Sequence, residues 1–295
     1  MKKPPAAVRR LVYFGTPAAA VPPLVALADA GFEIPLVVTR PDRRRSRRAA
    51  PSPSPVSAAA RDLGLAVSHD VDDALDVGAD LGVVVAYGQL IRPHVLDRLA
   101  MVNLHFSLLP RWRGAAPVER ALLAGDEVTG VCVMALEEEL DTGAIYAQRE
   151  VLIGATATAD ELRAELVEAG TELLVTTLRT GLGSPTPQLG EPVHAHKLTA
   201  AELEIDWTDA AEVIDRWVRV GGAWTTVRHA RLKIWRAALR PELTVPPGHL
   251  VDGVVGTGTH GLELVEVQPE GRSRVDATAW ANGARLGPDE VLGRP

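Results

Sequence analysis

Short apolar runs alternate with helix-like segments over the first 180 or so residues of this chain. The runs "RLVYFG" (10–15), "EIPLVVT" (33–39) and "DLGVVVAYG" (80–88) are rich in aliphatic and β-branched residues, as strands buried on both faces are. Helix-like segments at 18–31 and 53–65 lie between them. Because parallel strands need crossover helices, this alternation predicts an α/β fold with an open, mostly parallel, doubly wound sheet.

Three further apolar stretches extend the same pattern. "MVNLHF" (101–106), "TGVCVMAL" (129–136) and "AIYAQREVLI" (144–153) are expected strands, and the first two flank a helix at 116–125. An amphipathic helix at 158–181 closes the series. Ligands of doubly wound sheets bind beyond the carboxyl ends of the strands, so function is expected there.

The sequence changes character after residue 181. We expect an α/β domain over 1–183, a Pro/Gly-rich polar linker over 184–205 and a second domain over 206–295. The second domain begins with a helix at 209–221 and continues with short strands separated by glycine turns, including 273–280. Such strands predict a small all-β barrel or sandwich.

Composition and charge restrict the class of protein. Hydrophobic residues make up 46% of the 295 and charged residues 23%, as in soluble globular proteins, and the short apolar run near the N-terminus predicts neither a signal peptide nor a membrane span. The single cysteine, Cys132, allows no internal disulfide, which fits a cytoplasmic protein. The net charge of −7 argues against a generally basic coat for nucleic acid, yet "RPDRRRSRR" (40–48) holds six arginines.

Three short motifs suggest chemistry that the rest of the sequence does not support. "FGTPAAA" follows the first strand but is not G-x-G-x-x-G, so it does not predict a dinucleotide site. "LDTG" (140–143) occurs once, whereas an aspartic protease needs two such carboxylates. "HAH" (194–196) has no third ligand nearby, and we expect a solvated connection rather than a metal site.

Asn103, His105 and Asp141 form the most coherent candidate site. Residues 103 and 105 point to the same side of an extended strand, where two donors could hold a developing oxyanion. Asp141 lies in a turn between two strands and could orient the imidazole. Each residue also has a structural interpretation: a strand-end cap, a core histidine and the start of a turn. No Ser/His/Asp or Cys/His set appears, which favours direct transfer of an acyl-type carbon to a nucleophile supplied by the substrate.

The stretch "NLHFSLLPRWRGAAP" (103–117), followed by "LDTG", resembles the formyltransferases that use 10-formyltetrahydrofolate. "SLLPRWRGAAPVERALLAGD" (107–126), "FGTP" near the start, and "KLTAAELEIDWTDAA" (197–211) are similar to the methionyl-tRNA formyltransferase family within that group. The resemblance covers nearly the whole chain. It implies a Rossmann-like catalytic domain followed by an OB-like barrel that binds tRNA.

The resemblance implies roles for particular residues. Asn103, His105 and Asp141 match the catalytic set of the family, without a metal. The expected folate-binding residues come from two segments: Ser107, Leu108, Leu109 and Pro110, and Tyr87, Gly88 and Ile91 in "AYGQLI". The implied reaction moves a formyl group from 10-formyltetrahydrofolate to the α-amine of methionyl-initiator tRNA for translation initiation.

The resemblance also implies a tRNA surface. The arginine loop occupies the position of a basic loop that enters the acceptor end of the tRNA, and in it we expect contacts from Arg43, Arg44, Arg45, Arg47 and Arg48. In the second domain, alternate basic residues from Arg228 to Arg240, chiefly Arg231 and Lys233, are candidate phosphate contacts. We expect a monomer that acts away from membranes.

Two other functions remain open on the sequence alone. A formyltransferase acting on a small amine, such as glycinamide ribonucleotide or an amino-sugar nucleotide, would share the transfer chemistry but would not need the arginine loop. A non-catalytic folate- or RNA-binding protein would not need the set Asn103, His105 and Asp141.

Overall fold

The computed structural model describes residues 2–44, 51–287 and 290–293. The chain divides into two compact units. The first comprises Met1–Pro117, Val128–Leu152 and Arg163–Ala195, and the second comprises Val118–Glu127, Ile153–Leu162 and His196–Pro295. The domain boundaries expected from the sequence, after residues 183 and 205, stay predictions.

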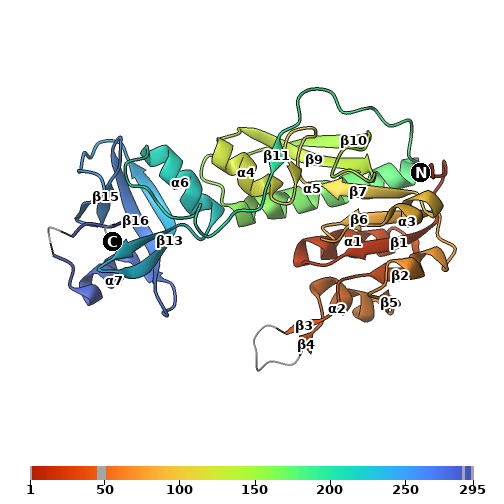
Figure 1. The fold of residues 1–295 in the computed structure, drawn as a ribbon, viewed down its shortest axis with the longest axis horizontal. Helices are drawn as coiled ribbons and strands as arrows, with labels where there is room; N and C mark the ends of the chain where they lie inside the picture. The colour runs from red at the N-terminus through yellow and green to blue at the C-terminus, as the bar shows by residue number, and fades with distance from the viewer. Residues whose placement is uncertain (1, 45–50, 288–289, 294–295) are drawn as a thin grey trace. The chain divides into compact units, whose positions relative to one another are not determined.

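A seven-stranded sheet in the order β10-β9-β7-β6-β1-β2-β5 forms the centre of the first unit (Figure 1). Its strands are β1 (Arg10–Gly15), β2 (Glu33–Val38), β5 (Val67–Ser68), β6 (Leu81–Val85), β7 (Met101–His105), β9 (Val128–Ala135) and β10 (Ile145–Leu152). The first five run parallel, whereas β9 runs antiparallel to β7 and β10 antiparallel to β9. The expected mostly parallel sheet is therefore confirmed, with two antiparallel strands at one edge.

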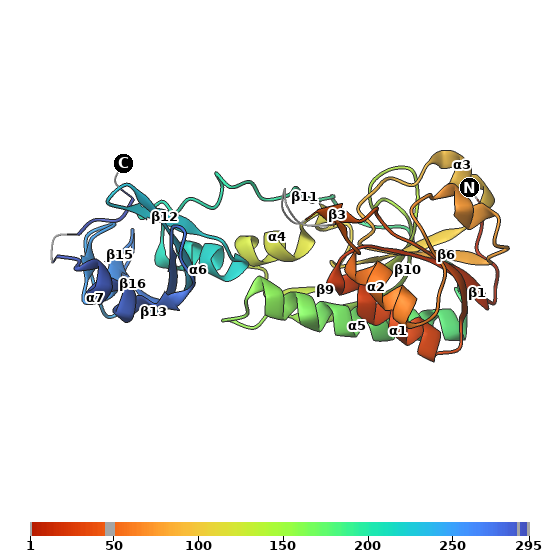
Figure 2. The same ribbon diagram turned by 90° about the horizontal axis from the view of Figure 1, so that it is seen from below.

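Helices cover both faces of this sheet. They are α1 (Val21–Asp29), α2 (Pro55–Asp62), α3 (Pro93–Arg98) and α5 (Ala159–Thr180), with short 3-10 turns η1 (Ala18–Ala20) and η2 (Asp72–Leu75). Figure 2 shows α1, α2 and α5 along one face. On the other face, residues of α3 and η2 pack with Val12 and Phe14 of β1 in one buried apolar cluster. Burial of apolar strands from both sides explains their nearly continuous hydrophobicity.

Local sequence signals set where two of the helices begin. Ser54 caps α2 by accepting a hydrogen bond from the Ser57 N–H at 3.0 Å, and Pro55 takes the first helical position. At the start of α5, the Thr158 hydroxyl accepts from the Glu161 N–H, and the Glu161 carboxylate accepts from the Thr158 N–H. This reciprocal capping satisfies two backbone donors that would otherwise lack partners.

Two small ladders accompany the main sheet. β3 (Arg43–Arg44) pairs antiparallel with β4 (Pro51–Ser52), and β8 (Arg113–Gly114) pairs parallel with β11 (His194–Ala195). The second ladder corrects the expectation that "HAH" is a solvated connection, because Ala195 is buried and bonded to the segment after β7. The linker therefore packs along the first unit in this stretch.

The second unit contains an antiparallel sheet in the order β12-β13-β16-β15-β14, with β17 paired to β16. Its strands are β12 (Trp224–Val227), β13 (Ala230–Arg240), β14 (Leu250–Val251), β15 (Val254–Gly256), β16 (Gly261–Pro269) and β17 (Val275–Asp276), and its helices are α4 (Pro117–Ala124), α6 (Ala211–Val220) and α7 (Ala277–Ala284). A core that includes Trp207, Ile214 and Ile234 joins α6 to the sheet. The expected antiparallel β-domain is confirmed.

The strand expected over 273–280 is wrong except at Val275–Asp276. Only Val275–Asp276 pairs with β16, and the chain then turns into α7. The cause is local: the Asp276 carboxylate accepts a hydrogen bond from the Ala279 N–H at 3.0 Å and so caps a helix. No helix among the described residues is long and apolar enough to span a membrane.

Candidate active site

Asn103 and His105 lie at the end of β7, on the same face of the strand. β7 sits between parallel β6 and antiparallel β9, so this end is flanked by the carboxyl end of β6. His105 is buried, and Asn103 is partly exposed. The location agrees with the rule that ligands of such sheets bind at the carboxyl edge.

Both ring nitrogens of His105 face acceptors. Nε2 lies 2.9 Å from the Trp112 carbonyl oxygen, so Nε2 carries a hydrogen and donates it there. Nδ1 lies 3.7 Å from Oδ2 of Asp141. The imidazole is therefore fixed between a carbonyl on the segment after β7 and a carboxylate on the turn between β9 and β10.

Asp141 has an unusual backbone conformation, and its carboxylate is fixed by a backbone N–H group. Its φ of 54° lies in the left-handed region, which few residues other than glycine adopt. Its Oδ2 accepts a hydrogen bond from the Gly114 N–H at 2.8 Å. A Cβ at Gly143 would lie 1.9 Å from the Ala135 carbonyl oxygen, so the turn requires glycine at that position.

Two residues that support this turn were not expected from the sequence. Gly114 donates to Asp141, and Gln188, from the expected linker, donates to the backbone carbonyls of Asp141 and Gly143 at 2.8 Å each. The contact between Gln188 and Asp141 joins residues 47 positions apart. No motif around Gln188 signals it, because only the folded path of the linker brings the two together.

The expected folate segment is tightly packed. The Ser107 hydroxyl is buried and donates to the Arg111 carbonyl at 2.6 Å. Leu109 packs with Cys132 and Met134 in a small core cluster and precedes a cis peptide bond to Pro110. Leu109, one of the expected folate-binding residues, therefore offers little surface to a ligand, whereas Leu108 and Pro110 are partly exposed.

Two of the expected residues in the loop after β6, Tyr87 and Ile91, pack their side chains into the core. Tyr87 is buried and packs edge-on against Phe14 with ring centroids 5.7 Å apart, while the Thr16 hydroxyl donates to the Tyr87 carbonyl. Ile91 packs against the same apolar cluster as Phe14. Gly88 has a φ of 75°, which reverses the chain there.

The expected tRNA contacts are described only in part. Arg43 and Arg44 form β3, and Arg45, Arg47 and Arg48 lie outside the described residues. On β13, the Arg231 guanidinium lies 3.8 Å from the centre of the Trp224 ring, and Lys233 Nζ lies 5.8 Å from that of Trp235. Two other basic candidates at the ends of this hairpin are ion-paired, because Arg228 contacts Glu290 and Arg240 contacts Glu263.

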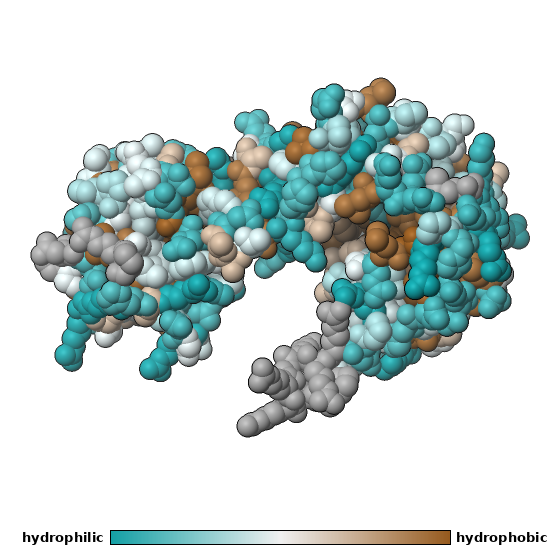
Figure 3. Space-filling model, viewed as in Figure 1, coloured by the Kyte–Doolittle hydropathy of each residue, from teal (hydrophilic) through white to brown (hydrophobic). Residues whose placement is uncertain are grey.

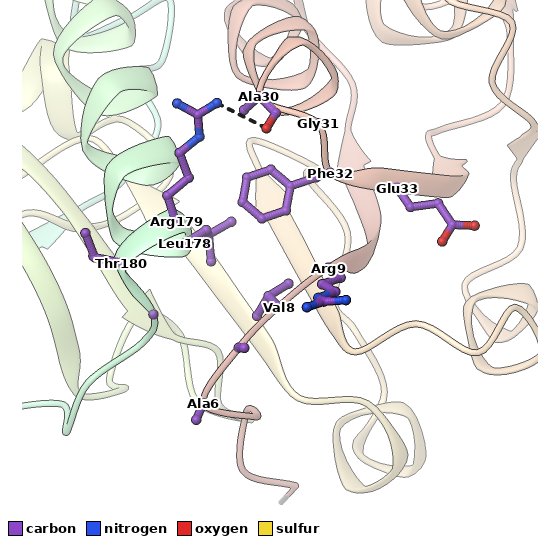
Figure 4. A pocket seen from close by; sticks show the side chains of 12 residues that line it. Ala6, Val8, Arg9, Ala30, Gly31, Phe32, Glu33, Leu178, Arg179 and Thr180 are labelled. Atoms are coloured by element: carbon purple, nitrogen blue, oxygen red, sulfur yellow. Dashed lines mark hydrogen bonds between the residues drawn. The ribbon is translucent and has the colours of Figure 1, made fainter.

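A pocket of about 530 Å³ lies at the opposite edge of the sheet. It is lined by Ala6–Arg9, Ala30–Glu33 and Leu178–Gly181, where β1 and β2 begin (Figure 4). The Arg179 guanidinium donates to the Ala30 carbonyl at its rim. None of the candidate catalytic residues lines this pocket.

The surface of the first unit is hollowed on the face shown in Figure 3, and apolar side chains gather around that hollow. Among the described residues, no group of three or more His, Cys, Asp or Glu side chains is placed to hold a metal ion. The polar groups assembled at the end of β7 are instead an amide, an imidazole and a carboxylate, which suit stabilisation of a developing oxyanion.

Both units of the chain are similar to known protein families. Residues 9–178 match the formyl transferase family and residues 197–285 match the formyl transferase C-terminal domain. The chain is 42% identical over 304 residues to the methionyl-tRNA formyltransferase of Paenarthrobacter aurescens (strain TC1), which covers 96% of this chain and 99% of that protein. It is 44% identical over 295 residues to the methionyl-tRNA formyltransferase of Clavibacter sepedonicus, which covers 93% and 97%.

Solved structures share the fold at lower identity. HypX from Aquifex aeolicus in complex with tetrahydrofolic acid superposes with a TM-score of 0.67 at 17% identity, over 95% of this chain and 48% of HypX. An N-formyltransferase from Helicobacter canadensis, in complex with folinic acid and dTDP-3-aminofucose, gives 0.66 at 14% identity over 89% and 99%. The family matches and the relatives that are more than 40% identical show that the chain belongs to the methionyl-tRNA formyltransferase family.

Proposed function

We propose that this chain transfers a formyl group from 10-formyltetrahydrofolate to the α-amine of methionyl-initiator tRNA, giving N-formylmethionyl-tRNA for translation initiation. The chemistry is supported by the His105 ring, whose Nδ1 lies 3.7 Å from Oδ2 of Asp141, and by Asn103 two residues earlier on β7. The choice of acceptor is supported by identity above 40% to methionyl-tRNA formyltransferases over almost the whole chain.

The folate supplies the formyl carbon, and the methionyl amine supplies the electron pair that attacks it. The bond from nitrogen to the formyl carbon forms, the bond from that carbon to N10 of the folate breaks, and a proton moves from the amine to N10. Negative charge develops on the formyl oxygen between these events. Preorganised donors lower the energy of that charge, which is the largest contribution expected from the protein.

Asn103 is suited to donate to the formyl oxygen. Its side chain is partly exposed at the end of β7, and no hydrogen bond ties it to another residue of the described chain. The carboxamide N–H groups are therefore available to a substrate oxygen. Two substrates held in line at this point would gain the large advantage of an intramolecular reaction.

His105 and Asp141 act as a pair beside Asn103. The ring donates from Nε2 to the Trp112 carbonyl and faces the Asp141 carboxylate with Nδ1, so a proton can be held at each nitrogen. In that form the ring places positive charge next to the formyl oxygen. The Asp141 carboxylate balances this charge and can receive the proton that leaves the amine.

The folate would lie against the segment 107–110 and the loop 86–91. Backbone groups in that loop can pair with the polar edge of a flat heterocycle, since the side chains of Tyr87 and Ile91 are turned into the core. Leu108 and Pro110 remain partly exposed and can flank the ring system.

The tRNA would be bound through basic residues in both units. In the first unit these are the arginines of the loop, Arg43, Arg44, Arg45, Arg47 and Arg48, of which the last three lie outside the described residues. In the second unit, Arg231 and Lys233 lie over the rings of Trp224 and Trp235. A cation over an indole ring keeps the N–H groups on its far side available to phosphate.

Since charged tRNA and ribosomes meet in the cytoplasm, we place the reaction there. We also propose a monomer, because one chain supplies Asn103, His105 and Asp141 without help from a second copy.

The test is a formyl-transfer assay with labelled 10-formyltetrahydrofolate and separate acceptors. Charged initiator tRNA, charged elongator tRNA, glycinamide ribonucleotide and an amino-sugar nucleotide would be compared at equal concentration. The proposal expects label on methionyl-initiator tRNA. Label on a small amine alone would refute the tRNA acceptor and leave the chemistry intact, and no label on any acceptor would refute both.

A further inference from the structure

The linker after α5 runs along the catalytic turn before it leaves the first unit. The N–H groups of Ile145 and Thr186 each donate to the carbonyl of the other residue at 2.8 Å. Further on, the Val193 N–H donates to the Pro110 carbonyl, and β11 pairs with β8. Gln188 lies between these two attachments.

The Gln188 side chain uses its full hydrogen-bonding capacity. Nε2 donates to the carbonyl oxygens of Asp141 and Gly143 at 2.8 Å each. Oε1 accepts from Nε and Nη2 of Arg113 at 3.0 and 2.6 Å. A guanidinium can only donate and a carbonyl can only accept, so the partners fix which end of the amide faces which way.

These bonds close a ring around the catalytic carboxylate. Arg113 holds Gln188, Gln188 holds the backbone on both sides of Thr142, and the Asp141 carboxylate returns to the N–H of Gly114, the neighbour of Arg113. Asp141 adopts a φ of 54°, which costs about 1 kcal/mol or more for a residue other than glycine. A strained turn of this kind persists only where surrounding contacts fix it.

We propose that Gln188 is a positioning residue for the reaction. It keeps the turn 141–143 in the conformation that directs the Asp141 carboxylate at His105, and Arg113 keeps the Gln188 amide in the required orientation. Gln188 acts through the backbone of Asp141 and contacts no reacting atom. The inference rests on the proposed function of Asp141 and adds the linker to the residues that determine turnover.

The sharpest test is Gln188→Glu. Glutamate has nearly the same shape and pairs with Arg113 at least as well, but it places an acceptor where two carbonyl oxygens need a donor. We expect kcat to fall about 30-fold, as for a misplaced catalytic group, with KM for folate and for tRNA changing less than about 3-fold. Gln148→Glu, at an exposed position on β10, is the matched control and should leave kcat unchanged.

A double-mutant cycle separates positioning from general stability. If Gln188 acts through Asp141, Gln188→Glu should change kcat less than about 2-fold in an Asp141→Ala background. An equal loss in both backgrounds, or wild-type kcat for Gln188→Glu, would overturn the proposal. If Gln188→Glu does not fold, Arg113→Met frees the Gln188 amide to rotate and should lower kcat about 5-fold, again only when Asp141 is present.

The wild-type protein, measured in the same assay, distinguishes the proposed tRNA acceptor from the proposed positioning role of Gln188. Failure of the wild-type protein to formylate methionyl-tRNA would refute the proposed acceptor. The effect of Gln188→Glu would then be measured with whichever amine reacts.

Discussion

Oδ2 of Asp141 lies 3.7 Å from Nδ1 of His105, while the same oxygen accepts a hydrogen bond from the Gly114 N–H at 2.8 Å. The carboxylate is thus anchored by backbone and faces the ring at a distance longer than a hydrogen bond. We expect it to act on His105 mainly through its charge. Both groups are buried, where such an interaction is screened far less than at the surface.

Asp141→Asn tests this charge. The amide keeps the shape and can still accept from Gly114, but it removes the negative charge that faces His105. We expect kcat to fall at least about 100-fold, with little change in the affinity for folate. Steady-state kinetics and equilibrium folate binding would be measured on one preparation. A variant with wild-type kcat would show that the carboxylate has no part in the reaction.

Cys132 is expected to be chemically silent in the folded protein. It is fully buried on β9, and burial raises the pKa of its thiol to about 11. Little thiolate therefore exists near neutral pH, and reagents cannot reach it. Labelling with a thiol-reactive dye should reach one group per chain after denaturation and almost none before. Rapid labelling of the native protein would contradict the packing of β9 against Leu109.

His260 and Glu212 should make the stability of the second unit depend on pH. Their side chains lie 3.0 Å apart; the hydrogen bond to Glu212 raises the pKa of His260 above 6.5, and the bond to His260 lowers the pKa of Glu212 below 4.5. The contribution of His260 to the free energy of unfolding is complete below pH 6.5, and it is lost as the pH rises through the raised pKa of His260. The glutamate contribution is complete above pH 4.5 and is lost as pH falls.

The His260–Glu212 pair should therefore stabilise the folded second unit most between pH 4.5 and 6.5. His260→Gln should lower the melting temperature more at pH 6 than at pH 8.5, as measured by thermal unfolding. Glu212→Gln serves as the partner control and should show the same dependence. An effect of His260→Gln that is equal at the two pH values would contradict the ion pair.

Arg231 and Lys233 should act on tRNA affinity and leave the chemistry unchanged. Replacing both by alanine should raise KM for methionyl-tRNA and leave kcat unchanged. The slope of log KM against log salt should shrink by about 1 to 2, because one or two phosphate contacts are lost. Arg240→Ala is the control on the same strand, since Glu263 already neutralises its charge. An unchanged salt slope would exclude this surface from tRNA binding.

The strands of the first unit and their mostly parallel arrangement could largely be predicted from sequence. Buried parallel strands carry continuous apolar runs, and β1 ends where the sequence placed its end, at Gly15. β6 stops at Val85, before the expected Gly88, because Ala86 and Gly88 both adopt positive φ and leave the extended region. The location of Asn103 and His105 at a strand end followed from the same periodicity.

The support of the site could not be predicted in this way. Gln188 and Gly114 have no local signal, because their contacts with Asp141 depend on where a linker passes after folding. The β8–β11 ladder is two residues long on each strand, which is too short for an alternation of apolar and polar residues to be recognised in the sequence. Leu109 is a related case. The sequence around an apolar residue next to a site does not show whether its side chain faces a ligand or, as here, the core.

The central claim is that the amide of Asn103 stabilises the negative charge on the formyl oxygen during transfer. A single-turnover measurement with Asn103→Ala tests it most directly, using enzyme in excess over methionyl-tRNA at saturating folate. We expect a transfer step about 100- to 1000-fold slower, with the dissociation constants of both substrates changed less than about 3-fold. A transfer step at the wild-type rate, or a slowing fully explained by weaker binding, would contradict it.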